Sequence, residues 1–176
     1  GLRMSIFPNG LPLPLILAVT AVIAYFCGCF NGAVIVSKYI LRNDVRNHGS
    51  GNAGLTNFYR VFGKQKILLV ILADVLKTVI AVLAGAALFH WAGNDPIIGK
   101  LLGGLLCMVG HMFPFQFEFK GGKGVSSTCG VMLMTFWWQA LICYVITIAL
   151  IAITKFVSLG SLALVVLFGI LVTATN

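Results

Sequence analysis

Long apolar segments follow one another along nearly the whole chain, and they limit its possible folds more than any other feature. Several approach the roughly 20 residues that a helix needs to cross a bilayer. The 176 residues are 60% hydrophobic and only 9% charged, which is too little charge to cover the surface of a soluble domain. The sequence therefore predicts an all-α integral membrane protein, a helical bundle forming one domain over residues 1–176.

The apolar pattern predicts six membrane-spanning helices, at residues 12–31, 67–89, 97–113, 125–136, 140–153 and 157–174. Asn31-Gly32 is expected to interrupt the first one, because apolar character continues to Ile40. Trp137 and Trp138 separate two short spans, and tryptophan favours the membrane interface, so a tight turn is expected there. The alternative is five spans with a re-entrant hairpin at these tryptophans.

The basic residues indicate an orientation. If the spans alternate, one side carries Arg42, Arg46, Arg60, Lys64, Lys66, Lys120, Lys123 and Lys155, and the other carries Arg3 and Lys100. Because cytoplasmic loops are enriched in Lys and Arg, the first side is predicted to be cytoplasmic and the N-terminus to lie outside.

Composition also excludes some partners. The net charge is +8, but no soluble segment is large enough to present a nucleic-acid site, so nucleic acid is not expected as a partner. The five cysteines lie in or beside apolar runs without other metal-ligating residues, and packed thiols are expected. We expect no metal and no cofactor.

A glycine-rich loop at residues 120–124, KGGKG, precedes the apolar run that begins at Val125. Glycines let backbone N–H groups converge on an anion, and a helix starting behind them adds its positive end. Lys120 and Lys123 supply full charges. Phosphate is the expected ligand. The alternative is that the segment is a plain turn that binds nothing, and the spacing of its residues does not fit a Walker A motif.

A second loop, at residues 46–63, combines Gly49, Gly51 and Gly54 with polar side chains. Its hydroxyl, amide and guanidinium donors are Ser50, Asn52, Thr56, Asn57 and Arg60. A guanidinium can hold phosphate through two parallel hydrogen bonds. The two loops are expected on one membrane face, where they would bind two phosphates or one large anionic group.

Three ionisable residues lie in or next to apolar segments. Asp74 and Lys77 are three residues apart and share a helical face. They either neutralise each other as a structural pair or support a polar site, and both interpretations stay open. His111 is the one group here that titrates near neutrality unaided, so it is a candidate proton acceptor, with bracing of the loop before Pro114 as the alternative.

Four motifs together resemble the bacterial acyl-phosphate:glycerol-3-phosphate acyltransferases. They read GSGNAGLTNFYR at 49–60, ADVLKT at 73–78, GHMFPFQFEFKGGKGVSS at 110–127 and TKFVSLGS at 154–161. The likeness runs from Tyr25 to the end, with Leu55 and Ser126-Ser127 as mild departures. Family members continue into a seventh span and a cytoplasmic tail, so a C-terminally truncated chain is expected.

The resemblance implies transfer of a fatty acyl group from acyl phosphate to the 1-hydroxyl of glycerol 3-phosphate, which gives lysophosphatidic acid and phosphate. It implies a multi-pass protein of the bacterial plasma membrane with its active site facing the cytoplasm. The implied partners are the two substrates, membrane lipid and an enzyme that produces acyl phosphate.

The candidate site residues divide into two groups. The catalytic candidates are His111, Asn57 and Lys120, and the substrate-binding candidates are Ser50, Asn52, Thr56, Arg60, Gly121, Gly122, Lys123 and Gly124. By resemblance, Ser50, Arg60 and Lys120 hold glycerol 3-phosphate, and residues 121–124 hold the acyl-phosphate head.

Two other functions would also explain part of the sequence. A membrane transporter of a phosphorylated anionic solute needs basic loops and intramembrane charges, but such sites usually lie between internal repeats, and we find no repeat. A lipid-binding structural subunit would explain the charge but not two glycine-rich loops. The resemblance favours the enzyme, and formation of lysophosphatidic acid rather than solute uptake would distinguish them.

Overall fold

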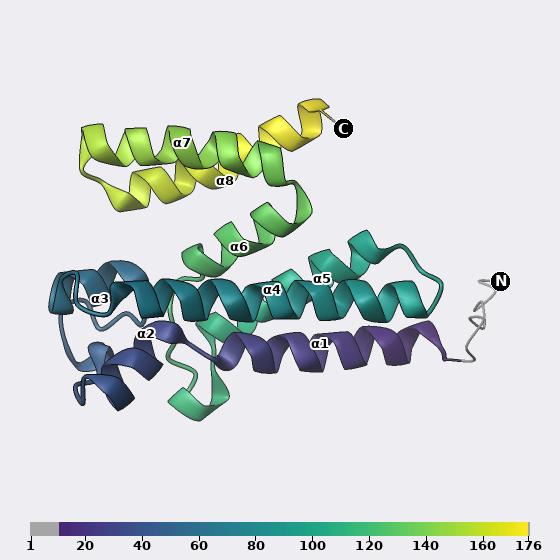
Figure 1. Ribbon diagram of the computed structural model, residues 1–176, viewed down its shortest axis with the longest axis horizontal. Coiled ribbons are helices and arrows are strands. Elements are labelled where there is room, and N and C mark those ends of the chain that lie inside the picture. The colour runs from purple at the N-terminus through teal and green to yellow at the C-terminus, as the bar shows by residue number, and fades with distance from the viewer. Residues whose placement is uncertain (1–10, 176) are drawn as a thin grey trace. The chain divides into compact units, whose positions relative to one another are not determined.

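A computed structural model describes residues 11–175, which form helices and connecting loops with no β-strand in that range (Figure 1). They divide into two compact units, Gly1–Val131 and Met132–Asn176. The α-helices are α1 (Leu13–Cys29), α2 (Gly32–Ile35), α3 (Leu55–Phe62), α4 (Ile67–Trp91), α5 (Pro96–Met112), α6 (Val125–Thr135), α7 (Trp137–Thr154) and α8 (Val157–Thr175). Shorter turns are the π-helical η1 (Val36–Ile40) and the 3₁₀-helical η2 (Val45–Asn47) and η3 (Phe115–Phe117).

The first unit is built on α1, α4 and α5, which pack against one another (Figure 1). Glycines mark the closest approaches. A methyl group on Gly28 of α1 would collide with the backbone of Cys107 in α5, and Gly85 of α4 lies directly against Gly99 of α5. Small residues let membrane helices approach until their backbones touch, which offsets the absence of a hydrophobic driving force in lipid.

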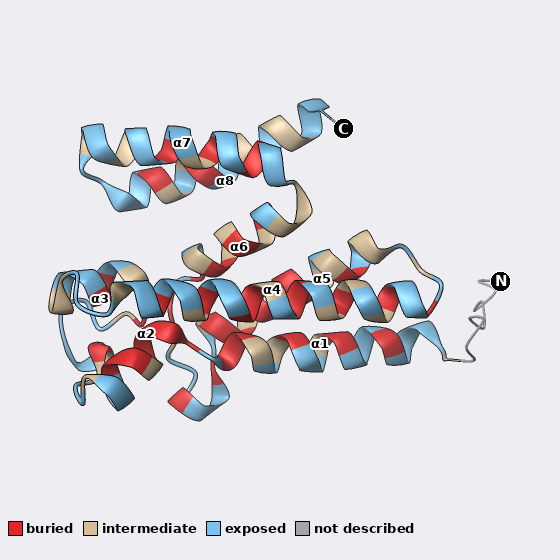
Figure 2. Ribbon diagram, viewed as in Figure 1, coloured by how far each residue is buried: buried red, intermediate tan, exposed pale blue. Residues whose placement is uncertain are grey.

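The outer faces of these helices are apolar and exposed, as Figure 2 shows for α1 and α4. Large exposed side chains include Phe26, Leu68, Leu76, Leu83 and Leu105. Within residues 11–175, five helices are long and apolar enough to cross a membrane, whereas α6 has only 11 residues. The all-α membrane fold is confirmed, and the count of six spans stays a prediction.

The expected interruption at Asn31-Gly32 is present. The α1 helix ends at Cys29, and the Asn31 side chain then accepts a hydrogen bond from Val34 N (3.1 Å) while donating to the carbonyl oxygen of Ala53 (3.0 Å). The amide of Gly32 donates to Asp74 Oδ1 at 3.1 Å. The break thus receives polar partners from α4 and from the loop before α3, which an uninterrupted helix would not need.

In the second unit, α7 and α8 form an antiparallel pair. The turn between them places Lys155 in the left-handed region (φ 62°), and Gln139 Nε2 near the start of α7 donates to Thr175 Oγ1 at the end of α8 (3.2 Å). The tight turn expected at Trp137-Trp138 lies one residue earlier, at Phe136, and both tryptophans belong to the first turn of α7. The TKFVSLGS motif contains the last residue of α7, the two connecting residues Lys155 and Phe156, and the first five residues of α8. Arg3, one of the two bases predicted on the side opposite the other bases, lies outside the described residues.

Candidate active site

The two glycine-containing loops lie side by side in the first unit, although they are about seventy residues apart in the chain. The amide of Ala53 donates to the carbonyl oxygen of Gly121 at 3.4 Å. Arg46 Nη1 donates to the carbonyl oxygen of Phe117 at 2.9 Å, and its guanidinium lies 5.3 Å from the centre of the Phe117 ring. These direct contacts agree with the expectation that both loops lie on one membrane face.

Arg46 is itself held by Asp44. Its Nη2 lies 2.7 Å from Asp44 Oδ2 and its Nε lies 3.1 Å from Oδ1, a forked ion pair. The hydrogen bond from Arg46 lowers the pKa of Asp44, and this outweighs the opposing effect of burial. The pair fixes the guanidinium, which in turn fixes the loop that carries Phe117.

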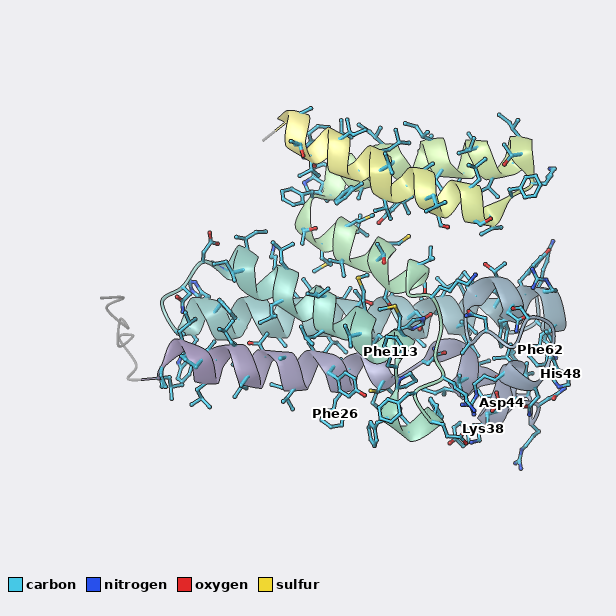
Figure 3. The ribbon with its side chains drawn as sticks, turned by 180° about the vertical axis from the view of Figure 1, so that it is seen from behind. Phe26, Lys38, Asp44, His48, Phe62 and Phe113 are labelled. Carbon is cyan, nitrogen blue, oxygen red and sulfur yellow. The ribbon has the colours of Figure 1, made fainter. Side chains whose placement is uncertain are left out.

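The aromatic segment after α5 is tied to the end of α1. Tyr25 Oη donates to the carbonyl oxygen of Phe113 (2.8 Å), and Gln116 Nε2 donates to that of Cys29 (2.7 Å). The rings of Phe26 and Phe115 meet edge to face with their centres 5.5 Å apart. Figure 3 labels Phe26 of α1 and Phe113 at the end of α5, together with Lys38 of η1 and Asp44 just before η2. These anchors set where the chain enters the glycine-rich loop.

Asn57 holds the shape of the loop at residues 46–63. It is buried in α3, its Oδ1 accepts from Ser50 N (2.9 Å), and its Nδ2 faces the carbonyl oxygens of Val45, His48 and Asn52 at 3.0–3.2 Å. All the polar atoms of its amide therefore meet backbone groups. The catalytic role predicted for Asn57 stays a prediction, and the observed contacts are those of a loop brace.

Ser50, Thr56 and Arg60 are exposed, whereas Asn52 is half-buried. Thr56 and Arg60 are four residues apart on α3, so they lie on one face of that helix. Gly49 and Gly51 have φ of 60° and 72°, which only glycine adopts easily, and they turn the chain around Ser50. The loop and α3 thus present two hydroxyls and a guanidinium to the surface on a braced backbone.

The glycines of the glycine-rich loop at residues 120–124 have an unexpected arrangement. Gly121 N donates to the carbonyl oxygen of Met112 (3.0 Å), and Gly122 N donates to that of His111 (3.1 Å). These two amides therefore complete the end of α5 instead of facing an anion. The helix α6 begins three residues later, and the first amides of a helix have no partner within it. The amides of this segment that remain available to an anion are then those at and after Lys123.

Lys123 is exposed, and Gly124 has φ of 79°, which turns the chain into α6. Lys120 is also exposed, and its Nζ lies 3.1 Å from Glu118 Oε2. The hydrogen bond from Lys120 lowers the pKa of Glu118. Both lysines can therefore reach a ligand at the surface, where their positive charges could neutralise a phosphate.

Below the glycine-rich loop lies a buried polar network that connects α4, α5 and α6. Lys77 Nζ lies 2.8 Å from Asp74 Oδ1 and 2.7 Å from His111 Nδ1. Ser126 Oγ donates to Asp74 Oδ2 at 2.8 Å. The sequence predicted the Asp74–Lys77 pair from its spacing. It did not predict that His111 and Ser126 join the pair, since these contacts span 34 and 52 residues.

Comparison with known proteins identifies the family. The glycerol-3-phosphate acyltransferase family model matches residues 18–175. A glycerol-3-phosphate acyltransferase of Thermoanaerobacter pseudethanolicus is 43% identical over 153 residues, covering 87% of this chain and 74% of the relative. The corresponding protein of Finegoldia magna is 38% identical over 147 residues, covering 84% of this chain and 71% of the relative.

Two solved structures agree with this. One is PlsY (YgiH), an integral membrane glycerol 3-phosphate acyltransferase in its glycerol 3-phosphate form, with a TM-score of 0.81 and 30% identity over 91% of this chain and 78% of that one. The other is its lysophosphatidic acid form, with a TM-score of 0.75 and 31% identity over 90% of this chain and 77% of that one. Sequence and fold agree over most of the length, and this chain belongs to the glycerol-3-phosphate acyltransferase family.

Proposed function

We propose that this membrane acyltransferase takes its acyl group from acyl phosphate and transfers it to the 1-hydroxyl of glycerol 3-phosphate. The products are lysophosphatidic acid and inorganic phosphate. The observation that carries the proposal is the direct contact between two loops, each with exposed cations, in a protein whose relatives are glycerol-3-phosphate acyltransferases. One loop suits each phosphate of the two substrates.

The chemistry suits such a site. The hydroxyl oxygen attacks the acyl carbonyl carbon, a new C–O bond forms, and the bond from that carbon to the phosphate oxygen breaks. Phosphate leaves with the electron pair, and the hydroxyl proton passes to a phosphate oxygen. Acyl phosphate is already activated, so the enzyme chiefly aligns two like-charged substrates and offsets their repulsion.

We assign the two substrates to two groups of residues, the first of which draws on both loops. Ser50, Arg60 and Lys120 would hold the phosphate of glycerol 3-phosphate, with Asn52 and Thr56 beside them. Lys123, Gly124 and the first amides of α6 would hold the acyl-phosphate head. Gly121 and Gly122 would contribute by leaving room, because they lack side chains where the loop meets α5 and Ala53.

The proposed setting is the plasma membrane of a bacterium, with the loops on the cytoplasmic side. Arg42, Lys64 and Lys66 are exposed near these loops in sequence, and cytoplasmic segments are enriched in such bases. The donor would come from a separate enzyme that makes acyl phosphate. To test the orientation, single cysteines at His48 and Asp95 are labelled with a membrane-impermeant maleimide. Labelling of both from one side of the membrane would contradict it.

The donor is tested by giving the purified protein, in lipid, glycerol 3-phosphate with either acyl phosphate or an acyl thioester. We expect one lysophosphatidic acid for each phosphate released, with acyl phosphate alone serving as donor. Product from the thioester alone would overturn the proposed donor. The transporter alternative predicts uptake of glycerol 3-phosphate into liposomes without any product.

A further inference from the structure

The buried network below the glycine-rich loop contains a lysine that contacts a histidine directly. Asp74, Lys77 and His111 expose 1%, 5% and 1% of their side chains, so water contributes little to their hydrogen bonding. Each polar group must therefore find its partners among the others, and the arrangement of donors and acceptors can be worked out.

The position of Lys77 determines which nitrogen of His111 carries the proton. A lysine ammonium has three donors and no acceptor. Its Nζ lies 2.8 Å from Asp74 Oδ1 and 2.7 Å from His111 Nδ1. Nδ1 must then be the acceptor, and a neutral ring that accepts at Nδ1 carries its proton on Nε2. A doubly protonated ring would place two donors face to face.

The Nε2 edge of His111 packs against Gly122. A methyl group on Gly122 would collide with Nε2 and would lie 2.7 Å from the carbonyl oxygen of Ala53. The carbonyl oxygen of His111 accepts the hydrogen bond from Gly122 N at 3.1 Å. His111 therefore holds Gly122 with both its backbone and its ring.

Asp74 holds the other end of the same segment. While Oδ1 faces Lys77, Oδ2 accepts the hydrogen bond from Ser126 Oγ in the first turn of α6, at 2.8 Å. The residues between Gly122 and Ser126 are Lys123, Gly124 and Val125, which carry the amides assigned to the acyl-phosphate head. One buried charge pair thus supports both ends of the proposed binding segment.

We propose that His111 is a positioning residue, held by Lys77 and Asp74 as the Nε2–H tautomer so that its ring fixes Gly122 and the direction of the amides that follow. It does not accept the substrate proton, because its one basic nitrogen already accepts from Lys77. The proposal rests on the assignment of residues 123–125 to the acyl donor, but the tautomer follows from the buried network alone.

Two amide substitutions test the role of each ring nitrogen. In His111→Gln the amide reaches the place of Nε2, whereas in His111→Asn it reaches only the place of Nδ1. We expect His111→Asn to raise the KM for acyl phosphate about tenfold, or about 1.4 kcal/mol, while the KM for glycerol 3-phosphate changes less than about twofold. His111→Gln should recover most of this loss. His90→Gln and His90→Asn are matched controls at an exposed histidine and should change neither KM.

Other patterns would overturn the proposal. If both His111 variants lowered kcat strongly with both KM values unchanged, His111 would be a proton acceptor. If both lowered thermal stability alike and raised both KM values alike, the ring would be only a structural filler.

The tautomer is measured directly by ¹⁵N NMR on the wild-type protein with labelled imidazole rings, and the His111 signals are identified by their loss in His111→Gln. We expect a protonated Nε2 and an unprotonated Nδ1 at neutral pH. A proton on Nδ1, or on both nitrogens, would overturn the proposal. If acyl phosphate is not the donor, the KM pattern is lost while the NMR result stands, so the two failures are distinguishable.

Discussion

Two ion pairs in the first unit have the same chemistry and opposite surroundings. Asp74 and Lys77 expose 1% and 5% of their side chains, whereas Glu118 and Lys120 expose 77% and 72%. The buried lysine has Asp74, His111 and a backbone carbonyl around it, so it is not available to a ligand. The exposed lysine can exchange Glu118 for a substrate phosphate. We propose that burial separates the charges that support the site from the charges that bind substrate in it.

A third pair lies between these extremes. Asp44 and Arg46 expose 14% and 16% of their side chains, and Arg46 also reaches the backbone of Phe117. This pair joins the two loops from the side. If burial determines the role of each pair, the loss of stability on breaking a pair should decrease in the order buried, half-buried and exposed. Defects in substrate binding should not follow this order.

The largest effect on stability is expected at the buried pair. Asp74→Asn leaves Lys77 without its counter-charge in a place water does not reach, which typically costs about 3 to 5 kcal/mol. Thermal unfolding in detergent or lipid would measure the loss. The double variant Asp74→Asn, Lys77→Met should recover part of it, since the unpaired charge is gone. A loss of stability in Asp74→Asn no larger than the loss in Glu118→Gln would contradict the comparison.

The largest effect on substrate use without loss of stability is expected at Arg60. Arg60→Lys keeps the charge but loses one of two charge-assisted hydrogen bonds, each worth roughly 1.5 to 3 kcal/mol. We expect kcat/KM for glycerol 3-phosphate to fall at least about tenfold. The change should lie in KM if Arg60 only binds, and also in kcat if it aligns the hydroxyl. A defect confined to acyl phosphate would reverse the loop assignment.

The sequence predicted the helical membrane fold, the break at Asn31-Gly32 and the two loops, because each depends on local composition. It did not predict that the amides of Gly121 and Gly122 are already used, since that depends on where α5 ends against the loop. The contact of Lys77 with His111 depends on the register of α4 against α5, which glycine packing sets. The glycines of one helix do not by themselves say which residues of the other helix they meet.

A smaller, pH-dependent effect is expected at Asp44. Because the pKa of Asp44 is lowered in the folded protein, the pair contributes its stability above the ordinary value of 3.8 and loses it as the pH falls through the lower folded pKa. Asp44→Asn should therefore destabilise the protein modestly at pH 7, by up to about 1 kcal/mol, because solvent screens a partly exposed pair. Unfolding curves of both proteins should converge below pH 3.8. A difference that grows on acidification would contradict this.

The smallest effect on stability is expected at Glu118. Its pair with Lys120 is surrounded by water, so Glu118→Gln should leave the unfolding temperature unchanged within error. Removing the competing carboxylate should lower the KM for glycerol 3-phosphate slightly, up to about twofold, if Lys120 binds its phosphate. An increase in that KM would indicate that Glu118 orients Lys120 and does not compete for it.

The separation between binding and supporting charges is tested most directly by the rise in unfolding temperature on adding glycerol 3-phosphate. A ligand at 100 times its Kd adds about 2.7 kcal/mol of stability. We predict that Arg60→Lys unfolds at the wild-type temperature without ligand but loses most of the rise at the same ligand concentration. The Asp74→Asn, Lys77→Met variant should unfold at a lower temperature without ligand and keep a rise at saturation. The opposite pattern, with Arg60→Lys destabilised but fully responsive and the double variant unresponsive, would contradict the account.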